Sequence, residues 1–182
     1  MVKKGSRYMF KLSMIGDYAV GKTSLIKRYM TNSFDEDYKA TLGAAISTFK
    51  TTVKDSLVSL QLWDLAGQTS FRRVRVQYLF GTDFAITVFD LTRKDTLNNI
   101  KEWIDDVRKG APEVLLYLVG NKLDLTTDRA VKVEAAEKMV KDLGILGYME
   151  TSAKDGTNVK QLFQVISELL VKHSVKPTKN RS

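Results

Sequence analysis

The chain of 182 residues contains no cysteine, only two prolines and a single histidine, His173. Without cysteine it cannot form disulfides, use a thiol nucleophile or build a cysteine-ligated zinc site. A histidine-dependent hydrolytic triad is not expected from one histidine near the end of the chain. The scarcity of proline and the hydrophobic fraction of 43% favour a folded chain over a disordered one.

Long apolar runs are also missing. No window approaches the ~18 continuous apolar residues of a membrane-spanning helix, and the first residues, "MVKKGSRYMF", lack the apolar stretch of a signal peptide. We therefore expect a cytoplasmic protein with one domain and a sizeable core. We place a flexible N-terminus at residues 1–7, the domain at 8–172 and a flexible basic tail at 173–182.

The net charge of +8 is partly gathered in short basic clusters, which raises nucleic acid or an anionic membrane as a partner. The aromatic residues do not interleave with these clusters as a base-stacking surface requires. We interpret the clusters as solvated faces and tails. The prediction is no specific nucleic-acid binding and at most weak peripheral contact with anionic lipid.

Short apolar runs alternate with helical patterns, which is typical of a parallel sheet with crossover helices. Residues 84–91 and 114–121 are almost entirely apolar, as expected of central strands covered on both faces. Residues 44–53 and 57–65 flank the turn "KDS" and predict a hairpin. The sequence therefore predicts an α/β fold. Its other expected elements are a strand at 8–16 and helices at 22–31, 95–110, 133–144 and 158–173.

The segment "GDYAVGKT" lies between the first strand and the first helix and matches G-x-x-x-x-G-K-[ST]. In this pattern backbone N–H groups surround a phosphate, glycines allow its close approach, and the helix N-terminus adds partial positive charge. Lys22 would contact the β- and γ-phosphates, and the Thr23 hydroxyl would bind Mg²⁺. The motif alone does not choose between ATP and GTP. The predicted phosphate-binding residues are Gly16, Asp17, Tyr18, Ala19, Val20, Gly21, Lys22, Thr23 and Ser24.

The segment "GNKLD" points to the base. The Asp124 carboxylate can accept hydrogen bonds from N1–H and the 2-amino group of guanine, whereas adenine would leave a buried carboxylate without partners. Asn121 would tie the loop, the Lys122 stem would cover a ring face, and the Ala153 N–H would meet the guanine carbonyl oxygen. The predicted base site comprises Asn121, Lys122, Asp124, Ser152, Ala153 and Lys154.

The four segments "GDYAVGKT", "WDLAGQ", "GNKLD" and "TSAK" together resemble a small GTPase of the Ras superfamily, in the family order and at the family spacings over residues 8–172. The residues of these motifs are most similar to those of the Rab and Rho branches. The resemblance implies a P-loop NTPase G domain, with a mostly parallel six-stranded sheet and about five helices on both faces. It also implies a monomeric switch that binds GDP and GTP with Mg²⁺ and hydrolyses GTP slowly without an activating protein.

The resemblance also implies roles for single residues. Thr41 would bind Mg²⁺ and contact the γ-phosphate, and Asp64 would hold Mg²⁺ through a water. Gly67 would give an N–H to the γ-phosphate and Gln68 would orient the attacking water, so Gln68, Lys22, Thr41 and Gly67 form the predicted catalytic set. Phe34 would lie against guanine, or fill local core, and Tyr38 would close over the phosphates. Effectors, exchange factors and activating proteins would bind at about residues 34–46 and 64–80.

Two features depart from the family pattern. Tyr18 stands where many relatives carry a small residue beside the γ-phosphate, so its ring would crowd Gln68, or swing outward without effect. The chain also lacks the cysteines that many relatives lipidate near the C-terminus. Either a lipidated tail is missing from this sequence, which would place the protein peripherally on membranes, or the protein has no such anchor. We interpret Arg72, Arg73 and Arg75 as a basic helix face rather than an internal arginine finger.

Three functional hypotheses remain open at this point. The first is a hydrolysing switch, which Gln68 favours. The second is a GTP-binding interaction module with little or no hydrolysis, which Tyr18 would permit by obstructing the site. The third is a basic GTPase bound to RNA, which the lack of an appended RNA-binding module disfavours.

Overall fold

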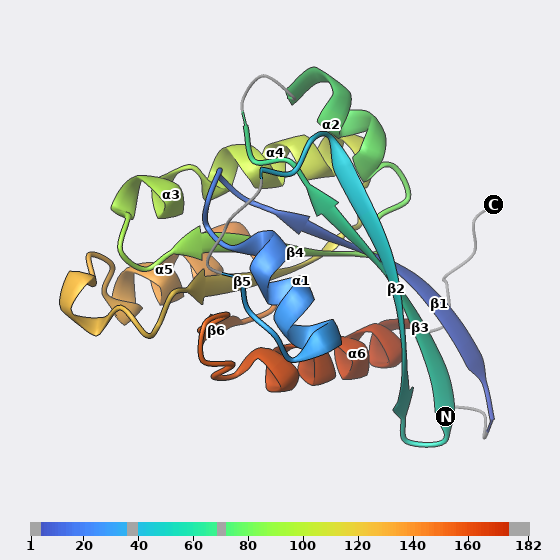
Figure 1. Cartoon of the computed structure of the whole chain (residues 1–182). Helices are drawn as coiled ribbons and strands as arrows, with labels where there is room; N and C mark the ends of the chain where they lie inside the picture. Colours follow the sequence, from blue (N-terminus) through green and yellow to red (C-terminus); the bar gives the residue numbers. More distant parts are fainter. Residues whose placement is uncertain (1–4, 36–39, 69–71, 175–182) are drawn as a thin grey trace.

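The computed structural model describes residues 5–35, 40–68 and 72–174. A six-stranded sheet with the order β2-β3-β1-β4-β5-β6 forms the centre of the molecule, and helices cover both of its faces (Figure 1). All neighbouring strands are parallel except β2 and β3, which form the expected hairpin. The strands are β1 (Arg7–Ile15), β2 (Ala44–Val53), β3 (Ser56–Leu65), β4 (Phe84–Asp90), β5 (Leu115–Asn121) and β6 (Tyr148–Thr151).

The four helices that were predicted with bounds lie close to those positions, with one division. The helix expected over residues 95–110 is split at Asn99 into α3 and α4. No described helix is both long enough and apolar enough to cross a membrane. The helices are α1 (Lys22–Thr31), α2 (Arg72–Leu79), α3 (Lys94–Asn98), α4 (Ile100–Gly110), α5 (Val133–Leu143) and α6 (Val159–Ser174), with a 3₁₀ turn at Thr126–Asp128.

Regular structure extends slightly beyond the predicted domain bounds of 8 and 172 at both ends. Arg7 already belongs to β1, and the Gly5 N–H donates to the Asp55 carbonyl, so the chain joins the sheet before residue 8. At the other end α6 includes His173 and Ser174. Backbone hydrogen bonds extend β1 and α6 to these residues, and a hydropathy pattern does not reveal such bonds. The rest of the predicted tail lies outside the described residues.

The core has two parts, one on each face of the sheet. One part packs β1, β3 and β4 against α1 and α6, and the other packs the sheet against α4 and α5. In β4, Ile86 and Val88 belong to the first part while Ala85 and Phe89 belong to the second, which explains its continuous apolar sequence. Because β1, β3, β4, β5 and β6 run in one direction, their carboxyl ends meet at one edge of the sheet, where open α/β folds bind ligands.

Candidate nucleotide-binding site

Two glycines shape the loop between β1 and α1. A Cβ on Gly16, which has φ 139°, would lie 2.1 Å from the Val88 carbonyl oxygen, and one on Gly21, with φ 97°, would lie 2.2 Å from the Asn121 side-chain nitrogen. Larger residues therefore cannot take their places without moving a strand or the base loop. Gly21 precedes α1, and no side chain caps this helix. The first turn of α1 can therefore offer its N–H groups to an anion.

Lys22, the first residue of α1, is buried with only 6% of its surface exposed. Its ammonium donates hydrogen bonds of 2.8 Å to the carbonyl oxygens of Gly16 and Asp17. Burial lowers the pKa of Lys22 from its ordinary 10.5 to about 8, although the charges of Asp64 and Asp17 partly oppose the shift. A ligand phosphate would supply the negative charge that this buried cation lacks.

Three oxygen-bearing side chains from separate segments converge beside the loop. The Thr23 hydroxyl lies 2.5 Å from Asp64 Oδ2 and 2.9 Å from the Thr41 hydroxyl, and Thr41 lies 3.2 Å from the same carboxylate oxygen. Burial raises the pKa of Asp64, while hydrogen bonds from Thr23 and Thr41 and the charge of Lys22 oppose the shift. Asp64 Oδ1 is buried and has no hydrogen-bond partner among the described residues. Mg²⁺ prefers such hard oxygen donors, so these residues fit the predicted metal.

A second set of side chains forms a cavity of about 370 Å³ at the carboxyl ends of β5 and β6. The Ser152 hydroxyl donates to Asp124 Oδ1 at 2.6 Å and so fixes one oxygen of that carboxylate. Asn121 ties two loops together, because its side chain donates to the Val20 carbonyl at 2.9 Å and accepts from the Ala153 N–H at 3.2 Å. The cavity is lined, among others, by Ala19, Gly21, Ser24, Phe34, Asn121, Lys122, Asp124, Ala153 and Lys154.

Two predictions for the base site need qualification. The Ala153 N–H already has Asn121 as a partner, so a base carbonyl would have to share or replace that hydrogen bond. Phe34 combines both roles considered for it, because it packs against the α1 and α6 part of the core and also lines the cavity. Tyr38 lies outside the described residues.

Sequence reasoning missed Asp90, which joins the base and phosphate regions from the end of β4. Its side chain is fully buried, and Oδ2 pairs with Lys122 at 2.7 Å and with Arg93 at 3.1 Å. Arg93 in turn donates to the Tyr18 carbonyl at 2.9 Å. Burial opposes ionisation of Asp90, but hydrogen bonds from Lys122 and Thr92 outweigh it and hold its pKa below the ordinary value. An acidic residue ending an apolar strand was the available signal.

A second missed network holds the other side of the loop. Trp103 Nε1 and Asn99 Nδ2 donate to the two carboxylate oxygens of Asp17, at 2.7 and 2.8 Å. The Asp17 side chain therefore points to α4, and its predicted part in phosphate binding rests on its backbone. The guanidinium of Arg75 lies 3.6 Å from the Trp103 ring centre, and its Nη2 pairs with Asp106 at 2.6 Å.

For Arg75 the expectation of a solvated position on α2 was wrong, while the side chains of Arg72 and Arg73 lie outside the description. Only 6% of the surface of Arg75 is exposed, and its partner Asp106 is also buried. An arginine engaged in this way is not available to reach the phosphate loop as an arginine finger, which agrees with the preference stated from sequence. Asn99, which precedes α4, and Trp103 stand four residues apart in the sequence, a spacing that could have indicated a shared partner.

Gly67 and Gln68 approach the loop from the end of β3. A Cβ on Gly67 would lie 2.5 Å from backbone atoms of Asp17 and Tyr18. Tyr18 is 44% exposed and lines a second cavity, of about 390 Å³, together with Gly67, Gln68 and Arg93. Tyr18 and Gln68 thus line the same cavity, and whether the Tyr18 ring crowds Gln68 or swings outward stays a prediction.

The sequence of the chain matches a family model described as the Ras family over residues 11–172. This range contains the loop before α1, the oxygen cluster, the base cavity and all strands in full except the first residues of β1. This match does not distinguish the branch within the superfamily, so the similarity of the motifs to those of the Rab and Rho branches stays a prediction. The chain belongs to the Ras family, and it is a small GTP-binding switch protein and GTPase of the Ras superfamily.

Proposed function

We propose that this protein binds GDP and GTP with Mg²⁺ at the edge formed by β1, β3, β4, β5 and β6, and hydrolyses GTP with Gln68 as the water-orienting residue. The observation that carries the proposal is that three kinds of group converge: a buried cation at Lys22, a cluster of oxygen atoms around the buried Asp64, and a hydrogen-bonded carboxylate at Asp124. A triphosphate, a divalent metal ion and guanine match them in turn.

The residues of the chain would act mainly by positioning. Lys22 would exchange its two carbonyl acceptors for phosphate oxygens, and the N–H groups before and within α1 would hold the remaining oxygens. Thr23 and Thr41 would hold the metal directly and Asp64 through a water, where the bound cation would neutralise charge developing on the phosphates. Gly67 would bring its N–H to the γ-phosphate because no side chain separates it from the loop.

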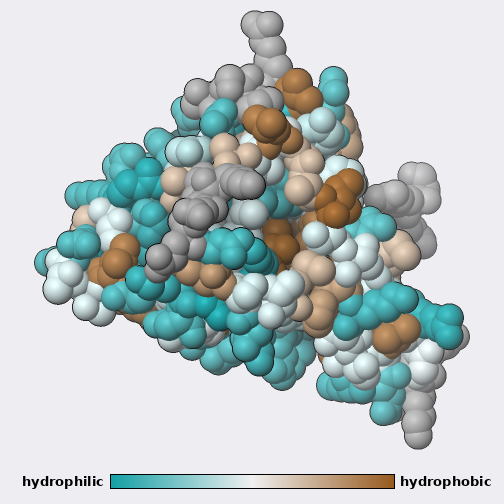
Figure 2. All heavy atoms as spheres, in the orientation of Figure 1, coloured by the Kyte–Doolittle hydropathy of each residue, from teal (hydrophilic) through white to brown (hydrophobic). Residues whose placement is uncertain are grey.

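Thr41 and Gly67 would link the nucleotide to partner binding. Both stand in the segments proposed to contact effectors and regulators, at about residues 34–46 and 64–80. Contacts of these two residues with a γ-phosphate would order the segments, and loss of that phosphate would release them. Leu42 and Ile46 are exposed in the first segment, at 79% and 56%, and offer apolar surface to a partner. Figure 2 shows apolar side chains exposed at several separate places on one face of the molecule.

Nucleotide identity tests the binding part of the proposal. The purified protein is unfolded, the released nucleotide is identified, and GDP and ADP affinities are compared by calorimetry in Mg²⁺ buffer. We expect guanine nucleotide to be retained in preference to adenine nucleotide, since adenine would offer no donor to the Asp124 carboxylate oxygen that Ser152 does not contact, at a cost of about 1–3 kcal/mol. Equal affinities for GDP and ADP, or no retained nucleotide, would contradict the base site.

Tyr18 supports the second candidate, a switch module with little hydrolysis, because its side chain shares a cavity with Gln68. Single-turnover hydrolysis in the natural chain, in Gln68→Leu and in Tyr18→Gly separates the two. A hydrolysing switch loses most of its rate in Gln68→Leu. An obstructed module is already slow and gains rate in Tyr18→Gly, and absence of any gain there would reject the steric role of the ring.

A further inference from the structure

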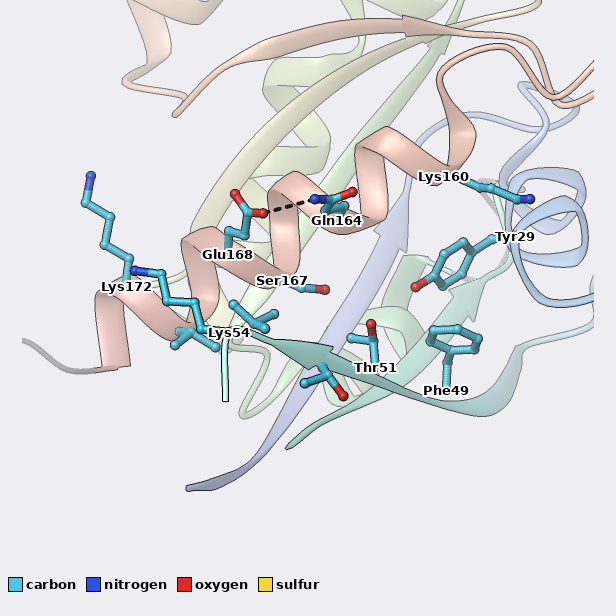
Figure 3. A pocket seen from close by; sticks show the side chains of 12 residues that line it. Tyr29, Phe49, Thr51, Lys54, Lys160, Gln164, Ser167, Glu168 and Lys172 are labelled. Carbon is cyan, nitrogen blue, oxygen red and sulfur yellow. Dashed lines mark hydrogen bonds between the residues drawn. The ribbon is translucent and has the colours of Figure 1, made fainter. Parts of the chain in front are cut away.

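A groove of about 930 Å³ lies between β2, the end of α1 and the outer side of α6 (Figure 3). None of the predicted nucleotide-binding residues lines it. We propose that this groove is a docking site for an acidic amphipathic segment of a partner protein, with apolar side chains on its floor and carboxylates at its rim. This proposal does not depend on the nucleotide that the protein binds.

The floor of the groove is apolar at its two ends, with the Thr51 and Ser167 hydroxyls between them (Figure 3). The Tyr29 ring stacks on Phe163 with 3.9 Å between ring centres and lies 4.4 Å from the Phe49 ring centre. At the other end, Val53 and Val171 are buried and line the same cavity. These side chains come from α1, β2 and α6, so the floor is part of the core rather than a mobile surface. Apolar side chains of a ligand would gain burial here.

The rim carries an excess of positive charge. Lys54, Lys160 and Lys172 line the groove and are exposed, whereas Glu168 is the single acidic residue among its lining side chains. Glu168 accepts a hydrogen bond of 3.2 Å from Gln164, as Figure 3 shows. None of the three lysines forms an ion pair with a residue that the structure describes. Carboxylates would therefore complement the rim.

The two ends of this chain do not match that charge. Residues 1–4 and 175–182 lie outside the structure, contain Lys and Arg, and carry no Asp or Glu. A partner protein is favoured further by position, because β2 begins within the proposed partner-binding segment 34–46 and ends in the groove. The stretch of α6 from Lys160 to Lys172 spans about 18 Å at the helical rise. About five or six extended residues of a partner would cover it.

The test selects random peptides displayed on phage against the whole protein, loaded in parallel with GDP and with a non-hydrolysable GTP analogue. Each selection is repeated on the groove variant Lys54→Glu, Lys160→Glu, Lys172→Glu. The matched control is Lys101→Glu, Lys132→Glu, Lys141→Glu, which makes the same charge change at exposed lysines on α4, before α5 and on α5. Dissociation of fluorescent GDP from each variant reports separately whether the nucleotide site is intact.

We expect enriched peptides to combine aromatic or aliphatic residues with Asp or Glu, and to bind the groove variant at least about tenfold more weakly while the control stays within about twofold. Gln164→Trp, which fills the groove without changing its charge, should weaken the same peptides by a similar factor and keep its thermal unfolding transition. No enrichment, enrichment of peptides without carboxylates, or equal binding to the groove variant would overturn the proposal. Retention on phosphatidylserine vesicles without peptide enrichment would overturn it in favour of a lipid surface.

Discussion

Replacing Asp90 with Asn tests the connection between the base and phosphate regions. The two side chains have nearly the same shape, and the amide oxygen can still accept from the N–H and hydroxyl of Thr92, which lie 2.9 and 2.7 Å from Oδ1. The amide nitrogen, however, would stand where Oδ2 now accepts from Lys122 and Arg93. Two cations would then face a donor instead of a carboxylate.

The magnitude follows from burial. The Lys122 and Arg93 side chains are 32% and 38% exposed, so water replaces part of each lost interaction, and each pair contributes about 1 kcal/mol rather than the 3–5 kcal/mol of a fully buried pair. With the desolvated donor that Asn introduces, we expect the free energy of unfolding to fall by about 2–3 kcal/mol. Because Lys122 and the Tyr18 carbonyl border the nucleotide site, GDP dissociation should become about tenfold faster.

The assay is stopped-flow dissociation of fluorescent GDP in Mg²⁺ buffer, with denaturant unfolding of the same samples. Asp95→Asn is the matched control, since Asp95 is exposed on α3 and makes no ion pair with a described residue. That variant should leave both quantities unchanged within about 0.5 kcal/mol. If Asp90→Asn behaves like the control, Asp90 does not hold the two regions together and the reasoning fails.

Three other predictions concern the loop before α1. Gly67→Ala should slow single-turnover GTP hydrolysis by at least about tenfold and keep the affinity for GDP, because the alanine Cβ would lie 2.5 Å from the Asp17 backbone. An unchanged rate would show that hydrolysis does not require the close approach of residue 67 to this backbone. Trp103→Phe should lower the free energy of unfolding by about 1–3 kcal/mol, since it removes the N–H donor that lies 2.7 Å from the Asp17 carboxylate. The control is Trp63→Phe, because the indole nitrogen of Trp63 has no hydrogen-bond partner among the described residues. In nucleotide-free protein, the pKa of Lys22 is about 8 in the folded state and 10.5 in the unfolded state, so between these pH values the unfolded state binds more protons. The free energy of unfolding should therefore rise across this pH range by up to about 3 kcal/mol. Lys22→Met should remove the rise, and a rise that persists in the variant would belong to another group.

Much of the fold was predictable because its signals are local. The alternation of apolar strands with amphipathic helices gives a parallel sheet, and the turn between residues 53 and 57 gives the antiparallel pair of β2 and β3. The break at Asn99 was not predicted, since the apolar stripe from Leu97 to Val107 continues across it. Periodicity reports which face is buried, and it does not report where a helix is interrupted.

Some residues of the candidate site were likewise predictable from the sequence, and others were not. Lys22, Thr23, Asp64 and Asp124 stand in motifs whose spacing carries their chemistry, so the order of residues is enough to propose their roles. Asp90 and Trp103 carry no such motif. Each looks like an ordinary residue at the end of a strand or on a helix, and only their partners reveal a part in the site.

The amino-acid sequence by itself was therefore sufficient for the family, the α/β fold and the guanine-nucleotide hypothesis, because phosphate loops and base-reading carboxylates depend on short, contiguous segments. Tertiary structure alone decided that Arg75 is buried against Trp103, that Asp90 joins Lys122 to Arg93, and that a basic groove lies beside α6. These contacts link residues far apart in sequence, and their energies depend on burial and distance, which no single segment encodes.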